Sequence, residues 1–237
     1  MAGAGLDAVV FDWGGTLAEF VPLEMTDVWT LAARHLAPDR EAEVAERLCA
    51  VEARFWERTA GACRSGTLAE LVAEASGELD LDVAEAVLEE AAVGHLDAWT
   101  PHIRHFAAAP AALESLRRRG LRVGLLSNTH WPRAFHERFL ARDGLDELID
   151  ARLYTSEMTH LKPHPSVFRA ALDALGVEDA TRAVFVGDRP YDDVWGAQQA
   201  GLRAVLVAND HAPPWDVAPD AVIDTLAELP AVVDAWR

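Results

Sequence analysis

The most informative carboxylate of the chain, Asp12, follows an apolar run and precedes two glycines. Residues 8–11 predict a buried strand, in which aspartate is rare. Gly14 and Gly15 allow a sharp turn and let another group approach the backbone amides closely. A carboxylate held in this way can serve as a nucleophile or as a ligand for a hard cation. From this stretch alone, a β-turn in which Asp12 bonds to its own turn amides is an equal alternative.

Three more polar side chains follow apolar runs that predict strands. Ser127 follows the run 121–126, Asp188 follows the run 183–186, and Lys162 lies in a loop beyond a third strand. Ligands of open parallel sheets bind beyond the carboxyl ends of the strands, so we expect these groups to converge near the first carboxylate. A nucleophile, a hydroxyl, a cation and a metal ligand at such positions are not explained by turn chemistry alone.

The elements that must position these groups alternate between strand and helix from residue 110 onward. This rhythm predicts a Rossmann-like α/β fold with a mainly parallel sheet flanked by helices. Strands are expected over residues 8–11, 121–126, 151–154, 183–186, 205–207 and 221–223. Helices are expected over residues 110–119, 132–140 and 191–200, before Leu175 and at the carboxyl terminus.

Between residues 20 and 99 the pattern is helical throughout and indicates an insertion. Helices are expected from Thr26 or Asp27 to His35, over residues 40–59, after a Thr67 cap with Glu70 at its third position, and over residues 81–99. Four helices without a strand describe a helical bundle. The predicted domains are an α/β core of residues 1–19 and 101–237 and a helical cap of residues 20–100.

The composition and charge of the chain limit the kinds of molecule that it can bind. The chain has 237 residues, 51% of them hydrophobic, which suffices for a full-sized core. The formal charge of −18 disfavours nucleic acid and acidic membrane surfaces, so an anionic substrate needs a local positive pocket. Two cysteines, no recognisable leader and no long apolar run predict a cytoplasmic protein without a membrane span. We expect a small-molecule substrate and a monomer or homodimer.

The motifs resemble those of the haloacid dehalogenase superfamily of hydrolases, in order and in spacing. The first motif is matched by residues 10–16 (Val-Phe-Asp-Trp-Gly-Gly-Thr) and the second by residues 126–129 (Leu-Ser-Asn-Thr). The third is matched by residues 162–165 (Lys-Pro-His-Pro) with Phe168, and the fourth by residues 186–193 (Val-Gly-Asp-Arg-Pro-Tyr-Asp-Asp). The helical insertion directly after the first motif resembles the common C1 type of cap.

The resemblance implies a phosphatase that acts on a small phosphorylated metabolite. Asp12 would attack phosphorus and form an aspartyl-phosphate, which water then hydrolyses. Ser127 would donate to a phosphoryl oxygen, and Lys162, the only lysine in the chain, would neutralise the nucleophile and the transferring group. Gly15 and Asn128 complete the expected substrate-binding residues.

The resemblance also implies a Mg²⁺ ion, which prefers oxygen ligands. Its expected ligands are the carboxylates of Asp12 and Asp188, the backbone carbonyl of Gly14, and Asp193. Asp192 is the alternative to Asp193, and the register set by the following Gly196 favours Asp193. Asp192 could instead serve only as a favourable charge at a helix N-terminus.

Gly14 departs from the pattern, because most phosphatases of this superfamily carry a second aspartate there as general acid and base. Loss of such a group typically removes about 10²- to 10⁴-fold in rate. One interpretation is an enzyme for leaving groups that need no protonation, such as aryl or acyl phosphates. Another is that His130 or His160, which flank the second and third motifs, takes over the role, although loop histidines are more often ordinary surface residues.

Three other hypotheses follow from the same departure. A phosphonoacetaldehyde hydrolase has a small residue at this position but needs a cap lysine, and the predicted cap contains none. A dehalogenase lacks both the second aspartate and the metal, but it does not keep the Gly-Asp pair that contains Asp188. A non-catalytic regulatory protein would retain the phosphate and magnesium pocket without turnover.

Substrate choice is expected to lie with the cap. Its candidate contacts surround the predicted helix break and offer positive charge and aromatic surface: Arg54, Trp56, Arg58 and Arg64. The equally simple alternative is that these arginines pair with the neighbouring Glu52 and Glu57 on a solvated helix.

Overall fold

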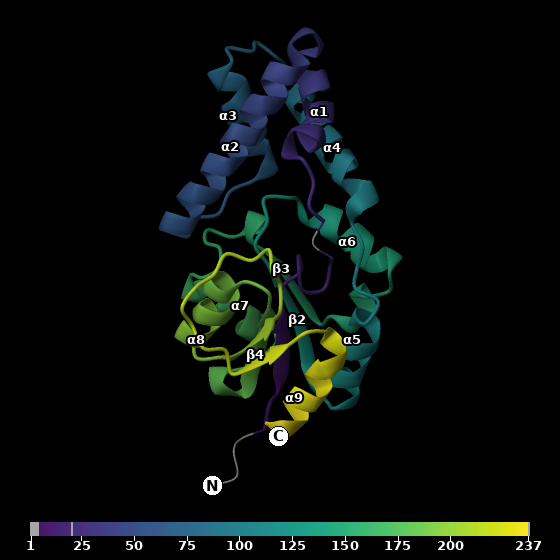
Figure 1. Cartoon of the computed structure of the whole chain (residues 1–237), viewed down its shortest axis with the longest axis vertical. Helices are drawn as coiled ribbons and strands as arrows, with labels where there is room; N and C mark the ends of the chain where they lie inside the picture. Colours follow the sequence, from purple (N-terminus) through teal and green to yellow (C-terminus); the bar gives the residue numbers. More distant parts are fainter. Residues whose placement is uncertain (1–4, 20, 237) are drawn as a thin grey trace.

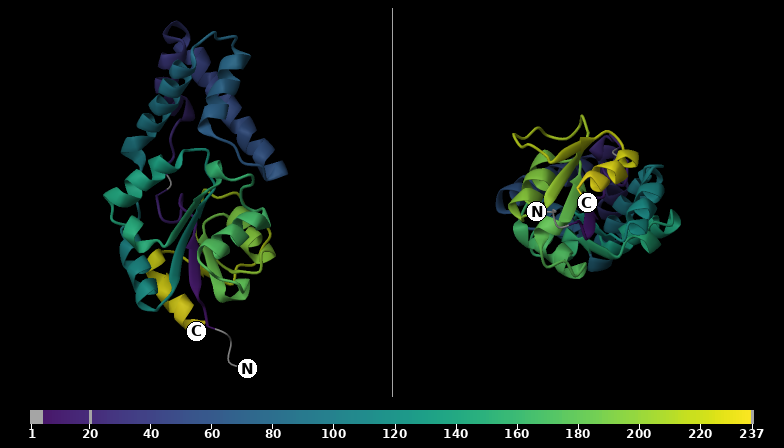
Figure 2. Two further views of the ribbon diagram at one scale, coloured as in Figure 1. Left: turned by 180° about the vertical axis from the view of Figure 1, so that it is seen from behind. Right: turned by 90° about the horizontal axis from the view of Figure 1, so that it is seen from below.

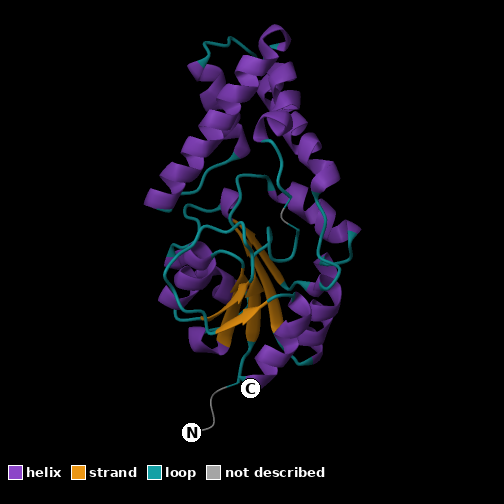
Figure 3. Ribbon diagram, in the orientation of Figure 1, coloured by secondary structure: helices purple, strands orange, loops and turns teal. Residues whose placement is uncertain are grey.

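A computed structural model describes residues 5–19 and 21–236, and its centre is a six-stranded parallel sheet (Figures 1 and 3). The strand order is β3-β2-β1-β4-β5-β6. The strands are β1 (Ala8–Phe11), β2 (Arg122–Ser127), β3 (Ala151–Tyr154), β4 (Ala183–Gly187), β5 (Arg203–Val207) and β6 (Ala221–Ile223). The Rossmann-like α/β fold is therefore confirmed. Central strands such as β1 and β4 are buried along their whole length, as expected of a sheet covered on both faces.

Helices cover both faces of the sheet (Figure 2), and alternate side chains of the strands build two cores. In β1, Val9 and Phe11 face one core, while Ala8 and Val10 face the other. The first core is closed by α5 (Ala109–Arg118), α6 (Arg133–Arg142) and α9 (Leu229–Ala235). The second core is closed by α7 (Pro165–Ala174) and α8 (Gly196–Gln199). This double covering fixes the sheet and thereby the places where its strands end.

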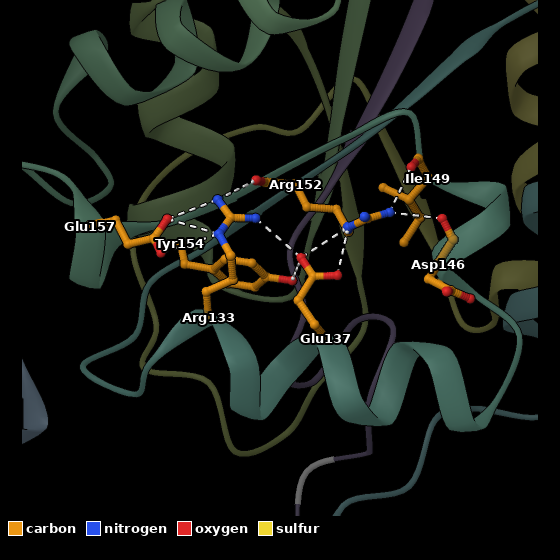
Figure 4. Close-up of polar contacts among 7 residues, drawn as sticks. All are labelled: Arg133, Glu137, Asp146, Ile149, Arg152, Tyr154 and Glu157. Carbon is orange, nitrogen blue, oxygen red and sulfur yellow. Dashed lines mark hydrogen bonds and ion pairs between the residues drawn. The ribbon is translucent and has the colours of Figure 1, made fainter.

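The edge of the sheet is tied to α6 by a polar network (Figure 4). Glu137 accepts hydrogen bonds from Arg133 at 3.1 Å, from Arg152 at 3.0 Å and from Tyr154 at 3.3 Å. Arg133 also pairs with Glu157 at 2.8 Å, beyond the end of β3. The network therefore holds α6 in a fixed position against β3 and the loop that follows β3.

Four helices between β1 and α5 pack around a core of their own, at the top of Figure 1. They are α1 (Met25–Leu36), α2 (Glu41–Ala62), α3 (Leu68–Glu78) and α4 (Glu85–Trp99). Trp29, Leu48 and Leu71 are among the side chains buried in this core. The predicted helical bundle is present, whereas the division into core and cap domains stays a prediction and its boundary at Phe20 lies outside the described residues.

Two details of these helices follow from local sequence. Thr67 and Glu70 form the predicted capping box at the start of α3, with hydrogen bonds of 2.7 and 3.3 Å. The helix predicted over residues 81–99 begins only at Glu85. The reason is that Asp80 has a left-handed φ of 52°, which ends α3 in a tight turn, so residues 81–84 cross to the next helix.

The helix predicted over residues 191–200 is not a regular α-helix. Residues Pro190–Trp195 form a wide π-helical turn, and only Gly196–Gln199 are α-helical. The main-chain amides of Asp193 and Val194 both donate to the carbonyl of Arg189, at 3.0 and 3.3 Å. Such turns are frequent at functional sites because they redirect a side chain. Here the turn directs the Asp193 side chain back toward the end of β4.

Two chain segments join the four helices to the sheet, and they run side by side. The amide of Glu19 donates to the carbonyl of Arg104 at 2.8 Å, and the amide of Phe106 donates to the carbonyl of Leu17 at 2.9 Å. The outgoing one of these paired linkers starts directly after the turn that contains Asp12, and the returning one pairs with it. Within the described part of the chain, no helix has the length and apolar character needed to cross a membrane.

Candidate active site

The only lysine of the chain lies between two carboxylates, one directly after β1 and one in the π-helical turn that follows β4. Lys162 Nζ is 2.6 Å from Asp12 Oδ1 and 2.6 Å from Asp193 Oδ1. Its side chain is buried, and Asp193 is buried as well. Burial lowers the pKa of Lys162, but attraction to the two carboxylates and their hydrogen bonds outweighs it and raises the pKa above its ordinary value. The ammonium group therefore stays charged.

The main chain of Lys162 is held by the second predicted motif. The amide of Lys162 donates to Asn128 Oδ1 at 2.8 Å, and Asn128 Nδ2 donates to the carbonyl of Lys162 at 3.0 Å. The side-chain amide of Asn128 is thus bonded to the Lys162 backbone, and its predicted contact with substrate stays a prediction. The two hydrogen bonds fix the height at which the ammonium group stands above the sheet.

Asp188 follows the end of β4 and has two side-chain partners, Thr16 of the first motif and Asn209, which lies outside all four motifs. Thr16 Oγ1 donates to Asp188 Oδ1 at 3.4 Å, and Asn209 Nδ2 donates to Asp188 Oδ2 at 2.6 Å. Asn209 lies just beyond β5, at the carboxyl end of a parallel strand. That position is the same signal that identified Asp12 and Ser127, and it could have identified Asn209.

Ser127 is the last residue of β2 and is buried. In the register of the sheet, Phe11 pairs with Leu125, so Ser127 and Asp12 leave neighbouring strands at the same edge. The structure thus brings the predicted hydroxyl to the edge where the two carboxylates and the ammonium group meet.

The two aspartates at the end of the fourth motif differ in position. Asp193 Oδ2 accepts a hydrogen bond from the Arg189 amide at 3.0 Å, and Asp193 Oδ1 meets Lys162. Asp192 points elsewhere and forms an ion pair with Arg189 at 3.6 Å. Asp193, and not Asp192, therefore joins the carboxylate cluster.

Three carboxylates make up a donor set that suits a hard divalent cation. Oxygen atoms of Asp12, Asp188 and Asp193 all lie within 4.8 Å of one another, and no other group of this kind occurs among the residues described. Burial, with repulsion from neighbouring carboxylates, raises the pKa of Asp12 to about 7 and that of Asp188 to about 6. Three buried acids around one ammonium group are short of positive charge, which a Mg²⁺ ion among these oxygens would supply.

The glycine turn after Asp12 has one crowded and one open position. Gly15 has a φ of +82°, and a Cβ atom there would stand 2.3 Å from Asp188 Oδ2. Gly14 is exposed, and a Cβ atom there would meet nothing within 4 Å. Packing against Asp188 therefore requires a glycine at position 15, whereas packing does not require one at position 14.

Replacing Gly15 with alanine is expected to lower kcat/KM by about 10²-fold, because the new methyl group must displace the Asp188 carboxylate and small misplacements at a reacting centre cost that much. For the magnesium-dependent phosphatase that the sequence motifs imply, the assay is hydrolysis of an aryl phosphate with titrated Mg²⁺, and we expect the half-saturating Mg²⁺ concentration to rise. Gly77→Ala in α3, where a Cβ atom meets nothing within 4 Å, is the control. A Gly15→Ala enzyme as active as Gly77→Ala would contradict this account of the turn.

His130 lies in the contact between the four helices and the sheet. Its ring is buried, and neither ring nitrogen has a hydrogen-bond partner among the described residues. Burial lowers its pKa to about 3, so the ring is neutral. Phe55 and Trp56 of α2 pack against it, and Glu52 Oε1 is 3.7 Å from Nε2. A role as replacement acid or base stays a prediction.

His160 has a different environment. Its ring stacks on His164 with 3.8 Å between centroids, and both rings have Nδ1 near Ser166 Oγ. The backbone of His160 pairs with that of Arg64 in an antiparallel bridge.

The segment between α2 and α3 docks on the loop that precedes Lys162. The amide of Ser65 donates to the carbonyl of Thr159, and the amide of Leu161 donates to the carbonyl of Cys63, both at 3.1 Å. These main-chain bonds place the helical insertion directly above the loop that carries the ammonium group.

Two of the arginines predicted near the helix break do form ion pairs, but with other partners than expected. Arg58 pairs with Glu74 at 3.0 Å and Arg54 pairs with Glu78 at 2.5 Å, so the expected pairing with Glu52 and Glu57 is wrong for them. The physical reason is that α2 and α3 pack side by side and bring Glu74 and Glu78 opposite the arginines. Glu52 instead accepts a hydrogen bond from Trp29 Nε1 at 2.8 Å.

A family model described as haloacid dehalogenase-like hydrolase matches residues 6–201. This chain belongs to the haloacid dehalogenase-like hydrolases. The predicted superfamily is thereby confirmed, and the protein is a hydrolase.

Among curated members of this hydrolase family, a phosphoglycolate phosphatase from Rhodospirillum rubrum is 32% identical over 234 residues, which cover 94% of this chain and 88% of that protein. A phosphoserine phosphatase from Thermus thermophilus is 38% identical over 52% of this chain and 49% of its own length. A glyceraldehyde 3-phosphate phosphatase from Pyrococcus abyssi is 33% identical over 44% of this chain and 42% of its own length. The chain thus spans about half or less of the last two proteins.

Solved structures of haloacid dehalogenase-like hydrolases have the same fold. A 2-haloacid dehalogenase from Pseudomonas syringae superposes with a TM-score of 0.75 and 25% identity, covering 98% of this chain and 100% of that one. A phosphatase from Thermococcus onnurineus superposes with a TM-score of 0.64 and 25% identity over the same shares. The hydrolase fold described above is therefore shared by enzymes named for two different reactions.

Proposed function

We propose that this hydrolase is a magnesium-dependent phosphatase in which Asp12 is the nucleophile. The observation that carries the proposal is the position of Lys162 Nζ, 2.6 Å from both Asp12 and Asp193, with Asp188 completing the carboxylate cluster. A buried carboxylate, a fixed ammonium group and a hard-cation donor set are the parts that phosphoryl transfer requires. The phosphatases among the relatives support the same reaction.

Two displacements at phosphorus complete the proposed reaction. An oxygen of Asp12 attacks phosphorus, and the bond from phosphorus to the leaving oxygen breaks with its electron pair on the leaving group. Water then attacks the phosphorus of the aspartyl-phosphate, the bond to Asp12 breaks, and inorganic phosphate is released. Lys162 and Ser127 hold the phosphoryl oxygens during both steps, since phosphoryl transfer depends mainly on positioning and charge neutralisation.

The proposed Mg²⁺ ligands are Asp12, Asp188, Asp193 and the carbonyl of Gly14. The ion, when bound, would neutralise the negative charge of the phosphoryl oxygens and so favour attack of the carboxylate on phosphorus. Thr16 and Asn209 hold Asp188 in place through their hydrogen bonds, at 3.4 and 2.6 Å.

Residues 20–100 are proposed to act as a cap of the C1 type above a core of residues 1–19 and 101–237. The docking of residues 63–65 on the loop before Lys162 supports this role, because a bound substrate would then be enclosed between the two parts. Enclosure excludes water and lets cap side chains contact the substrate. Arg64, whose backbone bridges to His160, is the nearest of the predicted cap contacts to that loop.

The leaving group sets the proposed substrate class. Gly14 supplies no acid to protonate a departing alkoxide, so the enzyme favours small phosphorylated metabolites whose leaving groups are stable as anions, such as aryl and acyl phosphates. A screen of phosphate esters with and without Mg²⁺ tests the proposal. Turnover that requires Mg²⁺ supports it, whereas binding of phosphate and Mg²⁺ without turnover of any ester would indicate a regulatory protein.

Replacing Gly14 with aspartate is expected to raise turnover of alkyl phosphates by about 10²-fold or more, because it restores a general acid. The structure has room for this side chain, since a Cβ atom at Gly14 would meet nothing within 4 Å. The φ of Gly14 is not positive, so its backbone conformation suits a residue with a side chain. The measurement is the slope of log kcat/KM against leaving-group pKa, which should become shallower. Gly14→Asn, of equal size but unable to transfer a proton, is the control. No gain in a folded Gly14→Asp enzyme would refute this explanation of Gly14.

The likeness to a 2-haloacid dehalogenase favours one second candidate. In that reaction Asp12 would attack carbon and displace halide. Asp188 and its partners argue for the phosphatase, because a cluster of three carboxylates within 4.8 Å is suited to a cation and unnecessary for halide displacement. Halide release from a 2-halocarboxylic acid in the absence of Mg²⁺ would decide for the dehalogenase.

A further inference from the structure

The residue next to the proposed nucleophile carries the hydrogen bond from which this inference starts. Trp13 Nε1 donates to Nε2 of His105 at 3.1 Å, and His105 Nδ1 is 2.6 Å from Asp143 Oδ2. Trp13 and the His105 side chain are buried. Two consecutive hydrogen bonds thus link Asp143, His105 and Trp13, and Trp13 is the residue next to Asp12.

The two hydrogen bonds require one protonation state of His105. An indole N–H can only donate, so Nε2 must be unprotonated. Nδ1 then carries the proton and donates it to Asp143, which sets the tautomer as a carboxylate commonly does for histidine. Asp143 stays ionised because Arg142 donates to it at 2.6 and 2.7 Å, and its pKa is lowered to about 2.

The three hydrogen-bonded residues belong to three different parts of the molecule. Trp13 belongs to the turn after β1, and its carbonyl accepts the amides of Leu17 at 2.9 Å and Ala18 at 2.7 Å. His105 belongs to the returning linker and pairs through its backbone with Ala18. Asp143 directly follows α6, which packs against the sheet. The nucleophile turn, the linker and the sheet are therefore joined at His105.

We propose that His105 and Asp143 are positioning residues for the proposed reaction: through Trp13 they fix the turn that carries Asp12 and tie it to the paired linkers of the helical insertion. The proposal rests on the proposed function. A nucleophile must stand within a fraction of an ångström of its line of attack, and errors of about 1 Å cost up to about 10²-fold in rate. Loss of the Trp13 bond should therefore lower kcat while leaving substrate binding intact.

Two substitutions of the same histidine separate this role from ordinary packing. In His105→Gln the side-chain oxygen can take the place of Nε2 and accept the Trp13 N–H. In His105→Asn the shorter side chain reaches only the Nδ1 position and leaves Trp13 without an acceptor. We expect His105→Asn and Trp13→Phe to lower kcat about tenfold to 10²-fold with KM within about twofold, and His105→Gln to keep most of the activity.

The double variant Trp13→Phe/His105→Asn is expected to be no slower than the slower single variant, because both changes remove the same bond. Trp29→Phe is the matched control, since Trp29 Nε1 also donates a hydrogen bond to a side chain, Glu52 Oε2 at 2.8 Å, but lies in α1 of the helical insertion. The indole N–H resonance of Trp13 in a nitrogen-15 spectrum should shift in His105→Asn and stay in place in His105→Gln.

Additive losses in the double variant, or equal kcat values for His105→Asn and His105→Gln in folded proteins, would overturn the positioning role. An unchanged kcat in Trp13→Phe would do the same. Failure of the proposed function is distinguishable from these outcomes, since it would appear as full activity in Asp12→Asn or as no activity in the unmodified enzyme.

Discussion

Asp12→Asn is expected to lower kcat for an aryl phosphate by at least about 10⁴-fold, because the amide oxygen cannot form the aspartyl-phosphate. The fold should survive the change. Burial and repulsion from Asp188 and Asp193 raise the pKa of Asp12 to about 7, so its ionised form is disfavoured in the folded state. Removing that charge is expected to leave the melting temperature unchanged or higher in magnesium-free, mildly alkaline buffer. Steady-state kinetics and calorimetry measure the two effects.

The matched control for Asp12→Asn is Asp192→Asn. Asp192 lies in the same motif as Asp193 but pairs with Arg189 outside the carboxylate cluster. We expect its replacement to lower kcat less than tenfold, an estimate that follows from the small worth of a partly exposed ion pair, about 1 kcal/mol or less. Equal losses in Asp12→Asn and Asp192→Asn would contradict the assignment of the nucleophile.

Lys162→Met is expected to lower kcat by about 10³-fold or more, as does loss of other cations that stabilise a transferring phosphoryl group. It also leaves two buried carboxylates, Asp12 and Asp193, without their ammonium partner. Removal of one partner from a buried ion pair costs about 3–5 kcal/mol of folding stability. We therefore expect a lower melting temperature that Mg²⁺ partly restores, and a rate loss that Mg²⁺ does not restore.

Lys162→Arg separates the loss of stability from the loss of rate that we expect in Lys162→Met. The guanidinium keeps the positive charge, so the melting temperature should stay nearer to that of the unmodified protein, while its larger planar group cannot occupy the same point between Asp12 and Asp193. A kcat close to that of the unmodified enzyme in folded Lys162→Met would contradict the proposed role of the ammonium group.

The sequence predicts much of the sheet and the residues at its edge, because buried parallel strands are continuous apolar runs and their carboxyl ends converge. Asp12, Ser127 and Asp188 could each be found in this way. Lys162 could be found only through its motif and its rarity, since a loop position carries no periodic signal. The match to the family model then confirms the family that these residues indicate.

Other features depend on packing between distant segments, which no local pattern contains. The hydrogen bonds of Asn128 to the Lys162 backbone join residues that are 34 positions apart. The pairing of Arg54 with Glu78 requires the contact between α2 and α3. The bond from Trp13 to His105 spans 92 positions and depends on the paired linkers. Such contacts become visible only when the elements are assembled.

The π-helical turn at Pro190–Trp195 has a different origin. Its sequence is compatible with an ordinary helix, so the local pattern predicts one helix over residues 191–200. The wide turn is stabilised by a tertiary contact, since Asp193 accepts the Lys162 ammonium group at 2.6 Å, in addition to the local bond from the Arg189 amide at 3.0 Å. Function and local preference disagree here, as they often do at active sites.

The most direct test of the central claim is to trap the covalent intermediate. The enzyme is mixed with an aryl phosphate and Mg²⁺, quenched in acid within one turnover, and digested for mass spectrometry, with borohydride reduction of a parallel sample. We predict one added phosphoryl group on the peptide that contains Asp12, homoserine at that position after reduction, and neither product in Asp12→Asn. Turnover without a phosphorylated Asp12, or phosphorylation of another residue, would contradict the account.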